Sequence, residues 1–94
     1  MARRFTRSDG VVERQVRENL ILVPLKTGPA RLDALYTLNE TAAVVWREAG
    51  QGGSEDAAVA RLVSEYDVDA DTARNDVRAV AERLVAIGAI RIEA

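Results

Sequence analysis

The fold is decided by one stretch of the chain, residues 34–52, which reads ALYTLNETAAVVWREAGQG. The residues around its start alternate between two faces, which predicts a half-buried strand over residues 32–38. Asn39 then supplies a helix N-cap and Gly50 a helix stop. Between them runs an apolar stripe at helical spacing: Ala42, Val45, Trp46 and Ala49. The stretch therefore predicts a strand that passes directly into an amphipathic helix.

Two more helices are predicted after this stretch. One begins at Ser54, a good N-cap, and carries a second apolar stripe: Val59, Leu62, Val63 and Tyr66. The next begins near Asp69 and ends at Gly88, and its stripe consists of Ala73, Val77, Val80, Ala81, Leu84 and Ile87. Residues 90–92 are then long enough for one short strand.

The residues before the deciding stretch are extended. Residues 11–25 predict two strands that turn about Glu18 and Asn19, and residues 1–10, which are polar and basic, predict a flexible arm. The predicted fold class is α+β, with a small N-terminal antiparallel sheet of about three strands, three helices and a short C-terminal strand. Two helices joined by a tight linker before a third amphipathic helix indicate a winged helix-turn-helix. We expect a single domain over residues 11–94.

Composition narrows the classes of function. The 94 residues suffice for one domain and contain neither Cys nor His, which removes thiolate nucleophiles and Cys or His zinc ligands. Residues 1–31 hold seven basic and three acidic residues, and residues 32–94 hold six basic and twelve acidic ones, giving the net charge of −2. An acidic helical half argues against nucleic acid as its partner.

Targeting signals are also missing from the sequence. No apolar segment follows the N-terminal arginines as a secretory signal would require, and no apolar run approaches the roughly 20 residues of a membrane helix. We therefore expect a cytoplasmic protein without a membrane partner.

Two short motifs invite a chemical interpretation, and neither supports an enzyme. Asp67, Asp69 and Asp71 have the spacing that begins a calcium loop, but Thr72 and Arg78 stand where that motif needs Gly and Glu. Capping of the third helix explains these carboxylates instead. The QGG segment lacks the Lys and Ser/Thr of a phosphate loop, so it is interpreted as a helix stop. No catalytic residue, metal site or cofactor is expected.

Two sets of side chains have both a structural and a functional interpretation. Trp46 lies on an apolar stripe, which favours core packing over ligand stacking. Arg74, Arg78 and Arg83 on the third helix would contact DNA in a DNA-binding winged helix, but acidic residues interleave with them. This mixed pattern is typical of a solvated helix face. A DNA-binding regulator remains the alternative function.

Residues 34–52 resemble the middle of the PqqD family, in which a strand ending in Leu-Asn leads to a Thr/Ala-rich helix with an apolar–Trp pair and a Gly-containing turn. The resemblance continues through SEDAAVARLVSEYDVD and LVAIGAIRI, and an extended lead-in, ERQVRENLILVPL, completes it over about residues 12–92. The segment from LNET to Trp46 is its more specific part, since the later helices would fit many helix-turn-helix proteins.

The resemblance implies a non-catalytic winged helix that binds peptides, known as a recognition element of ribosomally made, post-translationally modified peptides. Such a domain takes up the leader of a precursor as an added strand on its third strand, beside the third helix. It presents the precursor to a modifying enzyme such as a radical-SAM maturase, a leader peptidase or an ATP-dependent enzyme. A second copy of the chain could also pair with the exposed edge, so a homodimer stays open.

Physical arguments place the expected site on these elements. A free strand edge offers backbone groups to an extended peptide. The expected edge consists of Leu32, Asp33, Ala34, Leu35, Tyr36 and Thr37. Leu35 and Tyr36 would line a groove with three residues of the third helix: Val77, Ala81 and Leu84. Arg74 and Arg78 would meet leader carboxylates at the rim. For Leu38, Val77 and Leu84, core packing is favoured over a place in the groove.

Overall fold

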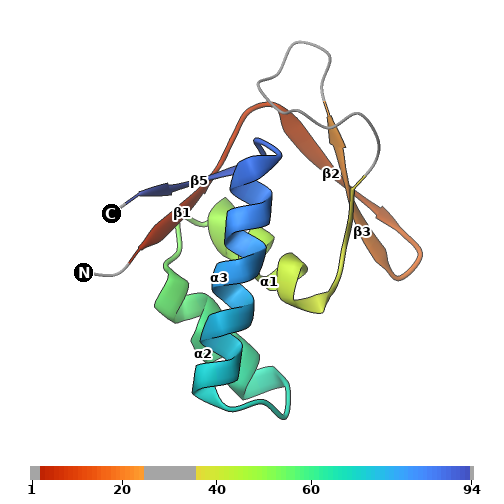
Figure 1. The fold of residues 1–94 in the computed structure, drawn as a ribbon. Helices are drawn as coiled ribbons and strands as arrows, with labels where there is room; N and C mark the ends of the chain where they lie inside the picture. The colour runs from red at the N-terminus through yellow and green to blue at the C-terminus, as the bar shows by residue number, and fades with distance from the viewer. Residues whose placement is uncertain (1–2, 25–35, 94) are drawn as a thin grey trace.

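The computed structural model describes residues 3–24 and 36–93. The elements follow in the order β1 (Arg4–Arg7), β2 (Val11–Val16), β3 (Asn19–Pro24), β4 (Tyr36–Leu38), α1 (Glu40–Gly50), α2 (Glu55–Glu65), α3 (Ala70–Ala86) and β5 (Ile90–Glu93). The strands form a two-stranded sheet, β1-β5, and a three-stranded sheet in the order β2-β3-β4. In Figure 1, β1 and β5 lie together on one side of α3 and the β2-β3 hairpin lies on the other. The α+β prediction of three helices with small antiparallel sheets is confirmed.

The predicted hairpin is present, with its turn one residue earlier than expected. Val16 and Asn19 are the last residues to pair, so Arg17 and Glu18 form the turn. Arg17 has a φ of 57°, the left-handed conformation that tight two-residue hairpin turns require. The predicted third strand is confirmed for Tyr36–Leu38, which pairs with β3, while residues 32–35 lie outside the described residues.

The three predicted helix starts are confirmed. The side chains of Asn39, Ser54 and Asp69 accept hydrogen bonds from the N–H groups of Ala42, Ala57 and Thr72, at 2.8, 3.1 and 2.7 Å. Each cap satisfies one of the N–H groups that the first turn of a helix leaves unpaired. None of the helices in residues 3–24 and 36–93 has the length and apolar character needed to cross a bilayer.

Trp46 confirms the core interpretation, with 1% of its surface exposed. Its indole N–H donates to Glu13 Oε1 at 3.2 Å, and the Arg7 guanidinium lies 4.0 Å from the ring centre. Arg7 Nε also donates to the Trp46 carbonyl at 3.0 Å. A single side chain of α1 is thereby joined to β1 and β2, which fixes both sheets relative to this helix.

Two residues of the predicted second stripe are not in the core. Val63 and Tyr66 are 42% and 38% exposed, so their assignment to the buried face was wrong. The buried face of α2 is formed by Ala58, Val59 and Leu62, and Val63 is turned about 100° away from Leu62. Tyr66 is the C-cap, with extended backbone angles, so the chain has already left the helix there.

The flexible-arm prediction for residues 1–10 is wrong for Arg4–Arg7. These residues form β1, which pairs with β5 along its whole length, and Phe5 is completely buried. The other edge of β1 is also occupied, since Phe5 N–H donates to the Gly53 carbonyl at 2.8 Å and Glu55 N–H donates to the Arg3 carbonyl at 2.7 Å. One buried aromatic ring and two ladders of backbone hydrogen bonds hold a segment that is polar and basic in sequence.

Candidate functional site

The three-stranded sheet has two edges, β2 and β4, and its register shows which backbone groups they leave free. Val16 and Asn19 close the hairpin turn, so they form a hydrogen-bonded pair. Because such pairs alternate along an antiparallel ladder, Leu20 and Leu22 direct their N–H and C=O groups toward β4. Thr37 is paired with Ile21, so its own N–H and C=O point away from the sheet. No strand within residues 3–24 and 36–93 pairs with this side of β4, so Thr37 marks its free backbone edge in the described part of the chain.

The two edges differ in charge. The exposed residues of β2 and its turn include Glu13, Arg14 and Arg17, and charged side chains on an edge discourage strand addition. The described part of β4 consists of Tyr36, Thr37 and Leu38, which carry no charge. An incoming extended peptide is therefore better accommodated by β4.

The structure places three predicted groove residues in the core. Val77 and Leu84 have no exposed surface and Ala81 is 2% exposed. They lie in the same core cluster as Leu22 and Leu38, and Tyr36 packs against that cluster. These three side chains support the sheet from within, as core packing of Val77 and Leu84 predicts; the same burial of Ala81 was not expected. Leu32, Asp33, Ala34 and Leu35 lie outside the described residues.

The structure does not bring Arg74 and Arg78 to the β4 edge; both pair with Glu55 at the start of α2. Arg74 Nη1 lies 2.7 Å from Glu55 Oε2, and Arg78 Nε lies 3.0 Å from Oε1. Arg74 also contacts Asp56 at 2.9 Å. The two guanidinium groups thus fasten α3 to α2, and a DNA-reading helix would need them free.

Glu55, the first residue of α2, is a buried charge that no sequence pattern singled out. It is 4% exposed and its Oε1 also lies 3.5 Å from Arg3 Nη1, so its carboxylate joins the residue before β1 to α2 and α3. Burial alone would raise the pKa of Glu55, but the hydrogen bonds from Arg78 and Arg74 and the charges of Arg78 and Arg3 lower it below its ordinary value of 4.5. Its partners Arg74 and Arg78 lie on α3, 19 and 23 residues later in the sequence. A pattern within one helix cannot reveal pairs that are so far apart in the sequence.

Replacing Glu55 by glutamine should reduce the pH dependence of stability. A lowered folded-state pKa means that the unfolded chain binds more protons, so the contribution of Glu55 is complete above pH 4.5 and is lost as the pH falls through the folded-state value. Glu55→Gln should cost about 1–2 kcal/mol at neutral pH, since the three arginines remain partly solvated. Urea unfolding at about pH 7 and about pH 3 should show this difference shrinking with acidity. An equal loss of stability at both pH values would contradict this prediction. Glu65→Gln, at an exposed position, is the control.

The flank of α3 on the side of β4 carries other residues. Asp76 lines a hollow together with Glu40 and Thr41, the first two residues of α1, which begins two residues after the end of β4. Ala79 and Arg83 come three and seven positions after Asp76, so they share its flank. Val85 lies on the opposite flank, where it lines a separate hollow with Ser8 and Ile90. A peptide on β4 would therefore face Asp76, Ala79 and Arg83 rather than Arg74 and Arg78.

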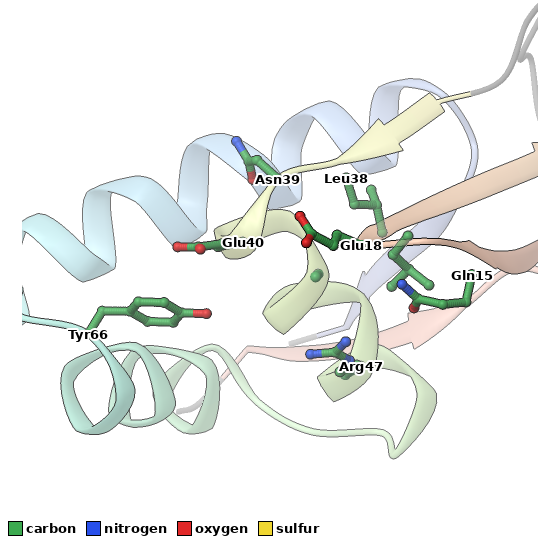
Figure 2. Close-up of a pocket in the computed structure, with 9 residues that line it drawn as sticks. Gln15, Glu18, Leu38, Asn39, Glu40, Arg47 and Tyr66 are labelled. Atoms are coloured by element: carbon green, nitrogen blue, oxygen red, sulfur yellow. The ribbon is translucent and has the colours of Figure 1, made fainter.

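A polar hollow of about 180 Å³ adjoins the end of β4. It is lined by Gln15, Glu18, Leu20, Leu38, Asn39, Glu40, Ala43, Arg47 and Tyr66. Figure 2 shows the Tyr66 hydroxyl and the Arg47 guanidinium directed into it from opposite sides. Among the described residues, no group of three acidic side chains has the arrangement of a metal site. The surroundings of β4 therefore offer backbone hydrogen bonds, aliphatic surface and scattered charges.

The comparison with known proteins settles the family. The family model of coenzyme PQQ synthesis protein D (PqqD) matches residues 19–90. The chain belongs to the PqqD family. The matched segment runs from the first residue of β3 to the first residue of β5, so it includes the β4 edge and all three helices of this PqqD-family chain. No curated protein matches the sequence.

Two solved structures share the fold of this PqqD-family chain. One is described as lasso peptide synthetase B1 complexed with the leader peptide; it has 24% identity and a TM-score of 0.77, and the alignment covers 93% of this chain and 96% of that one. The other is TbiB1 in complex with the TbiA(beta) leader peptide, also with 24% identity and a TM-score of 0.77, over 95% of this chain and 98% of that one. The similarity therefore extends over nearly the whole of both chains.

Proposed function

We propose that this protein captures the leader of a ribosomally made precursor peptide as an added strand on β4, beside α3, and presents it to a modifying enzyme. The observation that carries the proposal is the free edge of β4, whose described residues carry no charge and on which the backbone groups of Thr37 point outward. Support comes from the two structures of the same fold, whose descriptions both name a bound leader peptide. Addition to a strand edge is a recurrent mode of peptide recognition.

The proposed site keeps the predicted edge and replaces the predicted face of α3 by another. Residues 32–37 supply the edge, and Asp76, Ala79 and Arg83 form the wall on α3. Val77, Ala81 and Leu84 hold this wall against the sheet from the core. Arg74 and Arg78 keep α3 in place through Glu55. Each backbone hydrogen bond to the peptide contributes about 0.5–1.5 kcal/mol, so several of them with apolar contacts give micromolar affinity.

The proposed role is binding without catalysis. We infer a partner enzyme of the kind that acts on leader-bearing precursors: a maturase, a leader peptidase or an ATP-dependent synthetase. The first similar structure bears the description of a lasso peptide synthetase component, which favours an enzyme of such a synthetase as the partner class. Ribosomal synthesis of the precursor places this encounter in the cytoplasm.

Selection from a displayed library of random peptides tests the proposal. Recovered peptides should bind with micromolar or better affinity and shift the amide signals of Tyr36, Thr37 and the flank of α3 at Asp76–Arg83. A titration of the isotope-labelled protein with duplex DNA tests the DNA-binding alternative, and it should produce no comparable shifts. Shifts confined to the β2 edge, or tighter binding of the duplex than of any peptide, would refute the proposal.

A further inference from the structure

A second hollow lies beside the first, directly past the end of β4. It has a volume of about 190 Å³ and is lined by Glu40, Thr41, Leu62, Tyr66, Val68 and Asp76. These residues come from the start of α1, the end of α2 and its C-cap, the α2–α3 connection and α3. Glu40 and Tyr66 line both hollows, so the two lie next to each other. A water molecule takes up about 30 Å³ in the liquid, so the second hollow has room for one long side chain.

The second hollow combines aliphatic walls with negative charge. Leu62 is buried and Val68 is half-buried, which gives the hollow aliphatic walls. Its two carboxylates, Glu40 and Asp76, come from different helices, and no basic residue lines it. Neither carboxylate takes part in any ion pair among residues 3–24 and 36–93. An aliphatic stem that ends in a cation matches these walls and charges.

We propose that this hollow is a specificity pocket for one lysine or arginine side chain of the peptide that adds to β4. The inference rests on the proposed function and names a feature of its ligand. The stem of the basic residue packs against Leu62 and Val68, and its head lies between Glu40 and Asp76. Tyr66, which is 38% exposed, offers its ring face to the same cation.

The position of the pocket follows from the direction of β4. The strand ends at Leu38, and Glu40 begins α1 two residues later. A peptide that continues in line with the edge of β4 therefore passes Glu40 as it leaves the sheet. If the added strand is antiparallel, its basic residue precedes the residues paired with β4; if it is parallel, the basic residue follows them.

Peptides selected on matched variants test the pocket. Selection on the unaltered protein should enrich lysine or arginine at one fixed offset from the strand-forming residues. The double variant Glu40→Gln/Asp76→Asn should lose this enrichment, and basic peptides should bind it about tenfold more weakly, because a charge-assisted contact is lost. Glu65→Gln/Asp71→Asn changes the net charge equally at exposed positions of α2 and α3 and should retain it. Peptides that bind at β4 without a basic preference would overturn the pocket and leave the proposed function standing.

A small-molecule titration examines the pocket without any strand addition. N-acetyl-arginine methylamide should shift the amide signals of Thr41, Tyr66 and Val68, and its neutral isostere N-acetyl-citrulline methylamide should not. If no displayed peptide binds, the proposed function fails, and the arginine derivative still decides whether the hollow selects a cation. Equal shifts with both compounds, or none with either, would remove the pocket.

Discussion

Replacing Thr37 by proline should weaken peptide binding by about 10- to 100-fold while the domain stays folded. The outward N–H of Thr37 would be lost, and the peptide carbonyl that accepts from it would be left without a donor, at a cost of about 1–3 kcal/mol. The β3–β4 ladder should survive, because Leu20 and Leu22 form their hydrogen bonds with Leu38 and Tyr36. Proline is tolerated on an edge strand whose N–H faces solvent. Titration of a selected peptide by fluorescence anisotropy gives the affinity.

Gln15→Pro is the matched control for this experiment. Gln15 occupies the equivalent place on β2, where its pairing with Leu20 directs its N–H to the other free edge of the same sheet. Peptide affinity should be unchanged in Gln15→Pro. Equal weakening in both variants would show that proline acts through the stability of the sheet, and weakening in Gln15→Pro alone would move the site to β2.

Replacing Phe5 by alanine should destabilise the protein by about 3–5 kcal/mol. The ring of Phe5 is completely buried, and it belongs to the same core cluster as Trp46 and Ile90. A domain of this kind has a free energy of unfolding of about 5–15 kcal/mol, so this loss is a large part of the total. Trp46, the single tryptophan, reports unfolding in urea through its fluorescence.

Val12→Ala tests whether burial causes this effect. Val12 also lies in a strand but is 42% exposed. Val12→Ala should therefore lower the free energy of unfolding by much less than Phe5→Ala does. Removal of residues 1–7 should destabilise at least as much as Phe5→Ala, because the β1 ladder is lost together with the ring. A truncated chain as stable as the full one would instead support the flexible arm.

The parts of the fold that depend on neighbours in sequence could be predicted. Asn39, Ser54 and Asp69 begin the helices because a cap and the N–H that it satisfies are three residues apart. Strand β1 could not be predicted, since Phe5 is buried by pairing with Ile92, 87 residues away. A four-residue strand with three polar side chains has no periodic signal of its own.

The candidate site was predicted at the level of elements and less well at the level of side chains. The strand that ends at Leu38 and the third helix were both identified, but the helix face was chosen from the apolar stripe, which the core itself occupies. Arg74 and Arg78 were assigned to the rim because their partner Glu55 lies on another helix. Only the packing of α2 against α3 shows which flank of α3 remains for a peptide.

The pairing of β1 with β5 also bears on how this domain could be tethered to another protein. Arg4 lies opposite Glu93, so β1 begins beside the point where β5 ends, and Figure 1 shows both strands on the far side of α3 from the β2–β3 hairpin. An enzyme fused at either end would leave β4, the edge proposed for the peptide, open. Because the ends are so close, a short linker joining them would also permit a circularly permuted chain, opened at a surface turn, with the same groove.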